Sequence, residues 1–433
     1  LKQEESKEMR DIDAYAYTWD DLEPSKQQDA ITIGIKDYDD HLAWDPNPNH
    51  AKTSWELDEI SHQMGIQQVK FQGHWVKKAK VDKGNLKGRA RWTPHGFQEA
   101  SPSPVESPTV SQLSLRVLHV LGTQNRWKKF SFDLGSAFFT SDDCKKEHLW
   151  VREPPELMRD DGVPRYRQLW KSVPGTKAGP RDFYDSLYNY LVKSMGMERS
   201  KSDKCLFLSE SAPGEVNLFC GIHVDDGCGF GTDEAIDKFQ KDLEARFKVK
   251  FKIILIDTVH EFAGLEWLES YGQSGFDGVR ITQHAYIEIK LHEIELEKGR
   301  KKQRERTISQ EERGMLRSGL GSLRWVHRTV TEIGYDLNRL STWSSMETCT
   351  VDQLLRFNKV VRQVKTGYRE HDSVKGTKPI FPSIILPRLQ KTSLKCTLIV
   401  DAGEPTDDAL YRGKWHGGLA LSLIHISEPT RPE

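Results

Sequence analysis

The clearest pattern of apolar and polar positions lies near the middle of the chain. Residues 216–222 are mostly apolar, and the adjacent Asp225 and Asp226 follow shortly before a second, glycine-rich apolar stretch begins. This pattern predicts a buried strand, a tight turn and a returning strand. Because unpaired charge is costly to bury, two carboxylates at the end of such a strand need a compensating partner, usually a divalent metal. We therefore expect a hairpin with functional acids at its tip.

A second strand that ends in an acid is predicted at 128–133. Phe130 and Phe132 alternate with polar residues, as in a half-buried strand, and Asp133 follows them. One acid at a strand end and two at a hairpin tip can converge on two Mg²⁺ ions. Such a pair, about 3.5–4 Å apart, clamps the attacking and leaving oxygens of a phosphoryl transfer. Magnesium suits carboxylates combined with substrate phosphates.

Apolar positions at helical spacing predict further elements on both sides of these strands. The expected helices cover 109–125, 180–197, 233–247, 311–341 and 351–366, two short strands surround a basic turn within 61–106, and a strand at 396–401 ends in Asp401. Residues 1–60 hold sixteen acids against six bases and show weak periodicity, so we expect an acidic, disordered linker there. The mixture of helices with an antiparallel hairpin indicates an α+β fold.

Composition narrows the class of protein. The chain has 433 residues, of which 36% are hydrophobic and 29% charged, and it contains no apolar run long enough for a membrane span. The six cysteines lack CxxC spacing, which suits a reducing compartment. The net charge is −1, yet basic residues gather in 77–91 and 298–306. On composition alone both stretches can be solvated charged surface, and the alternative for 77–91 is a phosphate-binding segment.

Several segments follow one another in the order found in one polymerase family. They are 88–97, 107–110, Asp133 with Ala137 and Phe138, 149–156, 170–184, Val224 with Asp225 and Asp226, 262–266, 318–323 and 335–341. Each is weak alone, but their order is specific. Together they resemble the copia-type retrotransposon reverse transcriptase, the RNA-directed DNA polymerase region of the polyprotein, over residues 85–420.

The resemblance implies a right-hand polymerase. Fingers and palm would cover 61–270, a mostly helical thumb and connection 271–390, and a truncated start of a ribonuclease H-like domain 391–420, with Asp401 on its first strand. Residues 421–433 resemble the translation of a sequencing-library adapter, and we expect them to be an artefact. Implied partners are an RNA template, a DNA primer, dNTPs and the integrase and ribonuclease H parts of the polyprotein. No membrane partner is implied, and the expected location is a cytoplasmic retrotransposon particle or the nucleus.

The resemblance also assigns roles to individual residues. It implies that two Mg²⁺ ions, or Mn²⁺ in their place, are held by Asp133, Asp225 and Asp226. The implied dNTP-binding residues are Arg89, Arg91, Phe138, Lys177 and Ala178, and the implied nucleic-acid-binding residues are Lys77, Lys78, Lys80 and Lys87. Phe138 would lie under the sugar and reject a 2′-hydroxyl, or it would be a plain core aromatic residue.

Three positions depart from the family pattern. His223 stands where the family has tyrosine, His95 replaces a lysine of the fingers, and Ala178 replaces a glutamine that packs near the incoming nucleotide. The chain is therefore either an active, divergent polymerase or a catalytically inactive, nucleic-acid-binding remnant. Cys220, His223 and Cys228 could suggest zinc, but their strand positions and the missing fourth ligand favour core cysteines.

Overall fold

A computed structural model describes residues 17–82, 85–99, 105–141, 148–272, 276–366, 384–387, 394–403 and 416–425. The chain divides into two compact units. Leu1–Leu115 and Phe130–Lys252 form the first, and Arg116–Lys129 and Ile253–Glu433 form the second. Both helices and strands occur in each unit, so the α+β fold class is confirmed.

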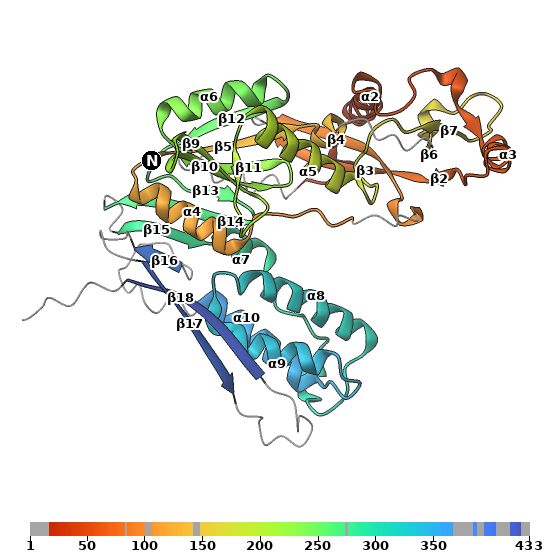
Figure 1. The fold of residues 1–433 in the computed structure, drawn as a ribbon. Helices are drawn as coiled ribbons and strands as arrows, with labels where there is room; N and C mark the ends of the chain where they lie inside the picture. The colour runs from red at the N-terminus through yellow and green to blue at the C-terminus, as the bar shows by residue number, and fades with distance from the viewer. Residues whose placement is uncertain are drawn as a thin grey trace, which may run out of the picture. The chain divides into compact units, whose positions relative to one another are not determined.

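The largest sheet of the first unit has six strands in the order β12-β5-β11-β10-β9-β8 (Figure 1). Their bounds are β12 Lys248–Ile254, β5 Lys128–Gly135, β11 Asp226–Gly231, β10 Glu215–His223, β9 Leu206–Ala212 and β8 Glu198–Arg199. Helices α5 (Gly179–Asn189) and α6 (Asp233–Glu244) pack on this sheet. Their apolar residues share one buried core with Phe130 and Phe132. The alternation that predicted the strand thus also supplies its core face.

Two smaller sheets complete the first unit. One has the order β1-β7-β6-β2, with β1 at Lys52–Thr53, β7 at Arg165–Gln168, β6 at Leu149–Arg152 and β2 at Val69–Phe71. The other is the long hairpin of β3 (Gly73–Asp82) and β4 (Asn85–Pro94). This hairpin matches the two strands around a basic turn that the sequence predicts.

The expectation of a disordered linker over 1–60 is wrong from residue 17 onward. Residues in this segment form α2 (Pro24–Asp40) and α3 (Ser54–Met64), whereas 1–16 lie outside the described residues. One face of α2 carries Ala30, Ile31, Gly34 and Tyr38, all buried, and it packs on β4. The apolar face of the helix outweighs the acidic composition, because burying it stabilises the helix more than the solvated acids destabilise it.

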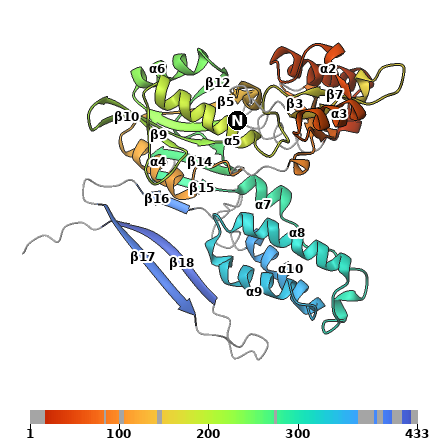
Figure 2. The same cartoon turned by 45° about the vertical axis from the view of Figure 1, so that its right-hand side comes forward.

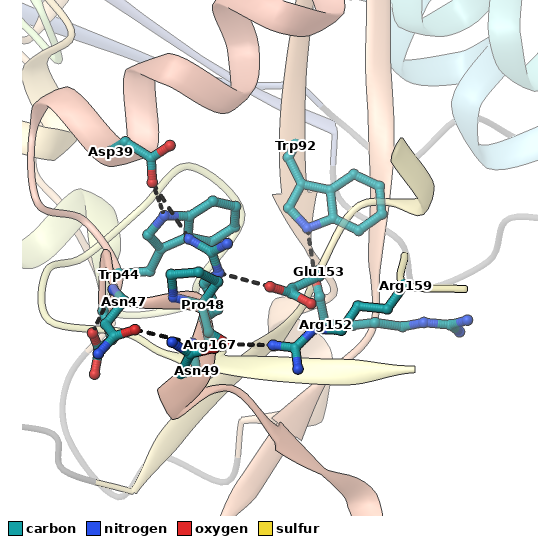
Figure 3. A network of polar contacts seen from close by, with 11 residues as sticks. Asp39, Trp44, Asn47, Pro48, Asn49, Trp92, Arg152, Glu153, Arg159 and Arg167 are labelled. Atoms are coloured by element: carbon teal, nitrogen blue, oxygen red, sulfur yellow. Dashed lines mark hydrogen bonds and ion pairs between the residues drawn. The ribbon is translucent and has the colours of Figure 1, made fainter. Parts of the chain in front are cut away.

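A polar network fixes the end of α2 to the neighbouring sheet (Figure 3). Arg167 donates to Glu153 at 2.7 Å and lies 3.5 Å from Asp39, which also accepts from the Trp44 indole at 2.6 Å. The Arg167 guanidinium lies over the Trp44 ring, 4.7 Å from its centre. Arg167 and Glu153 form a buried ion pair, and the partly exposed Asp39 links the end of α2 to Arg167 and to Trp44.

The second unit combines a sheet with a helical bundle (Figure 2). The sheet has the order β13-β14-β15-β16, with β13 at His260–Phe262, β14 at Leu265–Tyr271, β15 at Asp277–Thr282 and β16 at Ile384–Pro387. The helices are α4 (Gln112–Gln124), which begins in the first unit, α7 (His284–Lys290), α8 (Gln310–Val326), α9 (Gly334–Ser344) and α10 (Val351–Thr366). The last four share one core. A separate hairpin joins β17 (Leu394–Gly403), which contains Asp401, to β18 (His416–His425).

A fully buried charged cluster lies in the second unit. Lys129 donates to both Glu269 oxygens at 2.9 Å, and His119 Nδ1 lies 2.6 Å from Oε1 of the same carboxylate. The His119 ring stacks on Trp267 with centroids 3.8 Å apart. Burial lowers the pKa of His119 to about 4. Burial alone would raise the pKa of Glu269, but Lys129 and His119 lower it to about 2. This cluster is a neutralised part of the core.

The helices predicted from periodicity are found close to their expected bounds, as α4, α5, α6, α8 with α9, and α10. Cys220 and Cys228 are buried, as expected for core residues. Among the residues that the structure describes, no helix is long and apolar enough to cross a membrane. The assignment of fingers, palm, thumb and ribonuclease H boundaries stays a prediction.

Candidate active site

The predicted hairpin is present, and its turn carries the two aspartates. Strands β10 and β11 pair antiparallel, with His223 opposite Asp226, so Val224 and Asp225 form the connection. Val224 has a φ of 62°, in the left-handed region. This conformation is a genuine outlier for a β-branched residue and is kept only where the surrounding structure requires it. Val224 is therefore a strained residue of the turn that carries the two carboxylates.

Glycines after the aspartates make room for aromatic rings. A Cβ atom on Gly227 would lie 2.1 Å from the Phe132 ring, and one on Gly229 would lie 2.5 Å from the Phe130 ring. Phe130 and Phe132 belong to β5, the strand that carries Asp133. The rings of β5 lie against the backbone of β11, so these glycines serve packing.

Asp133 lies beside the hairpin turn. Strand β5 is the neighbour of β11, and the Leu134 N–H donates to the Asp225 carbonyl at 2.9 Å. The Asp133 side chain is 39% exposed and accepts a hydrogen bond from Lys250 Nζ at 2.9 Å. The fold thus brings together the strand end and the hairpin tip that the sequence singled out.

Asp226 is influenced by its burial and by the two carboxylates beside it. Partial burial, together with the charges of Asp225 and Asp133, raises the pKa of Asp226 to about 6, and Lys250 opposes this shift. Burial and the two neighbouring carboxylates thus both disfavour the charged form of Asp226. A cation bound beside Asp226 would offset both effects.

The donors at the turn fit Mg²⁺ by chemistry and charge. Carboxylate oxygens are the ligands that Mg²⁺ prefers, and a divalent cation would relieve the repulsion that acts on Asp226. Among the described residues, however, no three His, Cys, Asp or Glu side chains form a ready-made metal-binding group. Asp133, Asp225 and Asp226 would hold the ion only after a rearrangement of their side chains.

A pocket lies beside the turn. It is lined by Asp225, by Arg89 and Arg91 from β4, by Asp37 from α2 and by a segment that includes Phe138. Two arginines beside a carboxylate can receive the phosphates of a metal-bound nucleotide as charge-assisted donors. Phe138 is half-buried and packs against Phe183, with ring centres 5.8 Å apart, while it also faces this pocket. Both roles weighed for Phe138 are therefore compatible with its position.

Two residues of the predicted dNTP site, Lys177 and Ala178, lie outside the pocket that Arg89, Arg91 and Phe138 line. Lys177 donates through Nζ to the Glu99 carbonyl at 2.6 Å, and it does not line the pocket. Ala178 is 5% exposed at the start of α5 and does not line the pocket either. His95 stacks on Phe97 with centroids 5.5 Å apart. Lys177, Ala178 and His95 therefore contact nearby residues of the fold and do not line the pocket.

The basic hairpin presents two faces. In the β3–β4 register Lys78 lies opposite Arg89, and Lys80 lies opposite Lys87, although the Lys80 side chain is outside the described residues. Lys77 lies opposite Ala90, on the alternate face, and its ammonium is 5.4 Å from the centre of the Trp19 ring. Lys78 and Lys87 thus share the face of the pocket arginines, whereas Lys77 does not.

Sequence reasoning missed Asp37 and Lys250. Asp37 belongs to the segment interpreted as a linker, and partial burial raises its pKa. Lys250 belongs to β12, and it reaches Asp133 only because β12 lies beside β5. The helical spacing of Ala30, Gly34 and Tyr38 was a usable signal for α2. No pattern in the local sequence predicts that β12 lies beside β5.

Comparison with known proteins identifies the family. The family described as "Reverse transcriptase (RNA-dependent DNA polymerase)" matches residues 62–304, more than half of the chain. The chain belongs to this reverse transcriptase family. The matched range includes Asp133, Asp225 and Asp226, as well as both pocket arginines.

The relatives are retrotransposon polyproteins. The Retrovirus-related Pol polyprotein from transposon RE1 of Arabidopsis thaliana is 26% identical over 261 residues, which are 56% of this chain and 16% of that protein. The Transposon Ty1-BR Gag-Pol polyprotein of Saccharomyces cerevisiae is 26% identical over 266 residues, 60% of this chain and 14% of that protein. These relatives confirm the copia-type resemblance, and the chain spans a small part of their length.

Among solved structures, the foamy viral protease-reverse transcriptase in complex with double-stranded DNA is similar, with a TM-score of 0.40 and 13% identity. The similarity covers 93% of this chain and 64% of that one.

Proposed function

We propose that this reverse transcriptase region adds dNTPs to the 3′-hydroxyl of a primer on an RNA template by two-metal phosphoryl transfer. The observation that supports the proposal best is the position of Asp133 beside the turn that carries Asp225 and Asp226, where the Leu134 N–H donates to the Asp225 carbonyl at 2.9 Å. Partial burial and the two neighbouring carboxylates raise the pKa of Asp226 to about 6. Carboxylates are brought together at a solvent-accessible turn only at a cost. That cost is understandable if the turn binds cations.

Each residue of the site has a role in this proposal. Asp133, Asp225 and Asp226 would hold two Mg²⁺ ions, and Mn²⁺ would also suit these oxygen donors. When bound, the ions would activate the primer oxygen and neutralise the leaving pyrophosphate. Arg89 and Arg91 bind the triphosphate, and Phe138 contacts the sugar and excludes a 2′-hydroxyl. Lys78 and Lys87 bind the phosphates of the template and primer.

Primer extension tests the proposal. The protein should extend a DNA primer on an RNA template with dNTPs and Mg²⁺, and chelation by EDTA should stop the reaction. A gel-shift assay with the same RNA–DNA hybrid distinguishes the alternative. Binding without extension, in Mg²⁺ and in Mn²⁺, would identify the chain as a catalytically inactive remnant. Neither binding nor extension would contradict both functions.

A further inference from the structure

The Asp133 carboxylate already has a cationic partner. Lys250 Nζ donates to Asp133 Oδ2 at 2.9 Å, and the two side chains are 72% and 39% exposed. The same ammonium opposes the rise in the pKa of Asp226. A single lysine thus balances part of the negative charge at the turn.

Strand β12 positions this lysine by simple alternation. Val249 and Phe251 pack against the core that contains Phe130, whereas Lys248, Lys250 and Lys252 alternate with them and are exposed. Because β12 lies beside β5, the middle lysine of the three reaches Asp133. Lys252 lies on the same strand face, and no ion pair is found for it among the described residues. It provides a natural comparison.

An ammonium on Asp133 and a metal ion at the same carboxylate exclude each other in part. The oxygen that accepts the hydrogen bond is occupied, and two cations a few ångströms apart repel each other. We propose that Lys250 is a positioning residue that holds Asp133 while the metal site is empty, and that metal binding displaces it. The proposal rests on the proposed function, since it takes Asp133 as a metal ligand.

The expected effect is modest. Exposed ion pairs contribute little to stability, so Lys250 is easily displaced. Removing its charge should tighten metal binding by roughly three- to tenfold, because the site then loses both a competitor and a repelling charge. A carboxylate ligand has a larger influence, so Asp133→Asn should weaken binding by more than about tenfold.

Mn²⁺ binding to the full chain, without nucleotide or nucleic acid, tests this proposal. Free Mn²⁺ is measured by electron paramagnetic resonance at near-neutral pH for the wild type and for four variants, which are Asp133→Asn and the three lysine variants below. Lys250→Met should bind Mn²⁺ more tightly. Lys250→Arg keeps the charge and the hydrogen bond, so it should resemble the wild type. Lys252→Met removes the same charge from the same strand face and should also resemble the wild type.

The variants separate the possible failures. If Asp133→Asn binds Mn²⁺ as the wild type does, the metal assignment, and with it the proposed function, is wrong. If Asp133→Asn weakens binding but Lys250→Met does not tighten it, the metal site stands and the role of Lys250 is rejected. Equal tightening by Lys250→Met and Lys252→Met would show a general charge effect and would also reject that role. Circular dichroism of each variant checks folding.

Discussion

Glu269 is 1% exposed and has Lys129 and His119 within 2.9 Å, whereas Asp225 and Asp226 lie at a turn where their charged neighbours include another carboxylate, Asp133. The two sites therefore shift carboxyl pKa values in opposite directions. The partners of Glu269 lower its pKa, and burial and the carboxylate neighbours raise that of Asp226. In the buried cluster the counter-charge of the carboxylate lies within the chain, whereas at the turn neighbouring carboxylates repel one another and a bound cation would relieve that repulsion.

The largest effect is expected for Asp225→Asn, which should abolish primer extension. The amide removes the negative charge that would hold Mg²⁺, and loss of one charge-stabilising group at such a site costs at least about 10²–10³-fold in rate. The measurement is single-nucleotide incorporation under saturating dNTP. Asp160→Asn, from a solvent-exposed Asp-Asp pair away from the site, is the matched control. Wild-type activity of Asp225→Asn would contradict the proposal that the carboxylates at the turn bind metal for catalysis.

Glu269→Gln should instead reduce stability. The variant leaves Lys129 buried without a full counter-charge, and breaking a buried ion pair from one side costs about 3–5 kcal/mol of unfolding free energy. Urea denaturation measures this, with Glu332→Gln, at an exposed position of the same unit, as the control. The per-molecule rate of the folded fraction should be unchanged. A stable variant with lower activity would mean that the buried cluster takes part in function.

The pH dependence of stability is expected to follow the buried cluster in acid. The folded-state pKa of His119 is about 4, below its usual 6.5. Between these values the unfolded chain binds more protons than the folded chain, so stability falls as pH decreases from 6.5 to 4. His119→Gln should flatten the unfolding free energy over this window. An unchanged slope would show that other groups dominate acid unfolding.

The smallest effect, and one of opposite sign, is expected for Asp226→Asn in EDTA. The folded-state pKa of Asp226 is about 6, above its usual 3.8, so its ionisation costs stability as pH rises between these values. The variant should therefore be more stable than the wild type at neutral pH, by about 1 kcal/mol or less because solvent screens the charge. Thermal unfolding at neutral pH and at low pH measures the difference, which should disappear in acid.

The candidate site could be predicted where its signal is local. Apolar runs that end in acids predicted the strand of Asp133 and the hairpin of Asp225 and Asp226, because strand burial and turn formation depend on residues that are close in the sequence. Lys250 and the cluster around Glu269 could not be predicted, because they depend on which distant strands and helices become neighbours. The helix α2 was missed for another reason. The many acids of residues 1–60 obscure the helical spacing of its apolar residues.

The close packing of α2 on β4 has a practical consequence for producing this protein. A Cβ atom on Gly34 would lie 2.5 Å from the Ala90 carbonyl, and the buried Tyr38 hydroxyl donates to the Trp92 carbonyl at 2.8 Å. The range that matches the family begins at residue 62, after this helix, and ends at 304, before α8. A recombinant fragment cut at those limits would expose Ala90 and Trp92 and divide the α7–α10 core. Boundaries for expression should therefore follow the packing, with a start before Trp19 and an end after Pro387, so that β16 stays paired with β15.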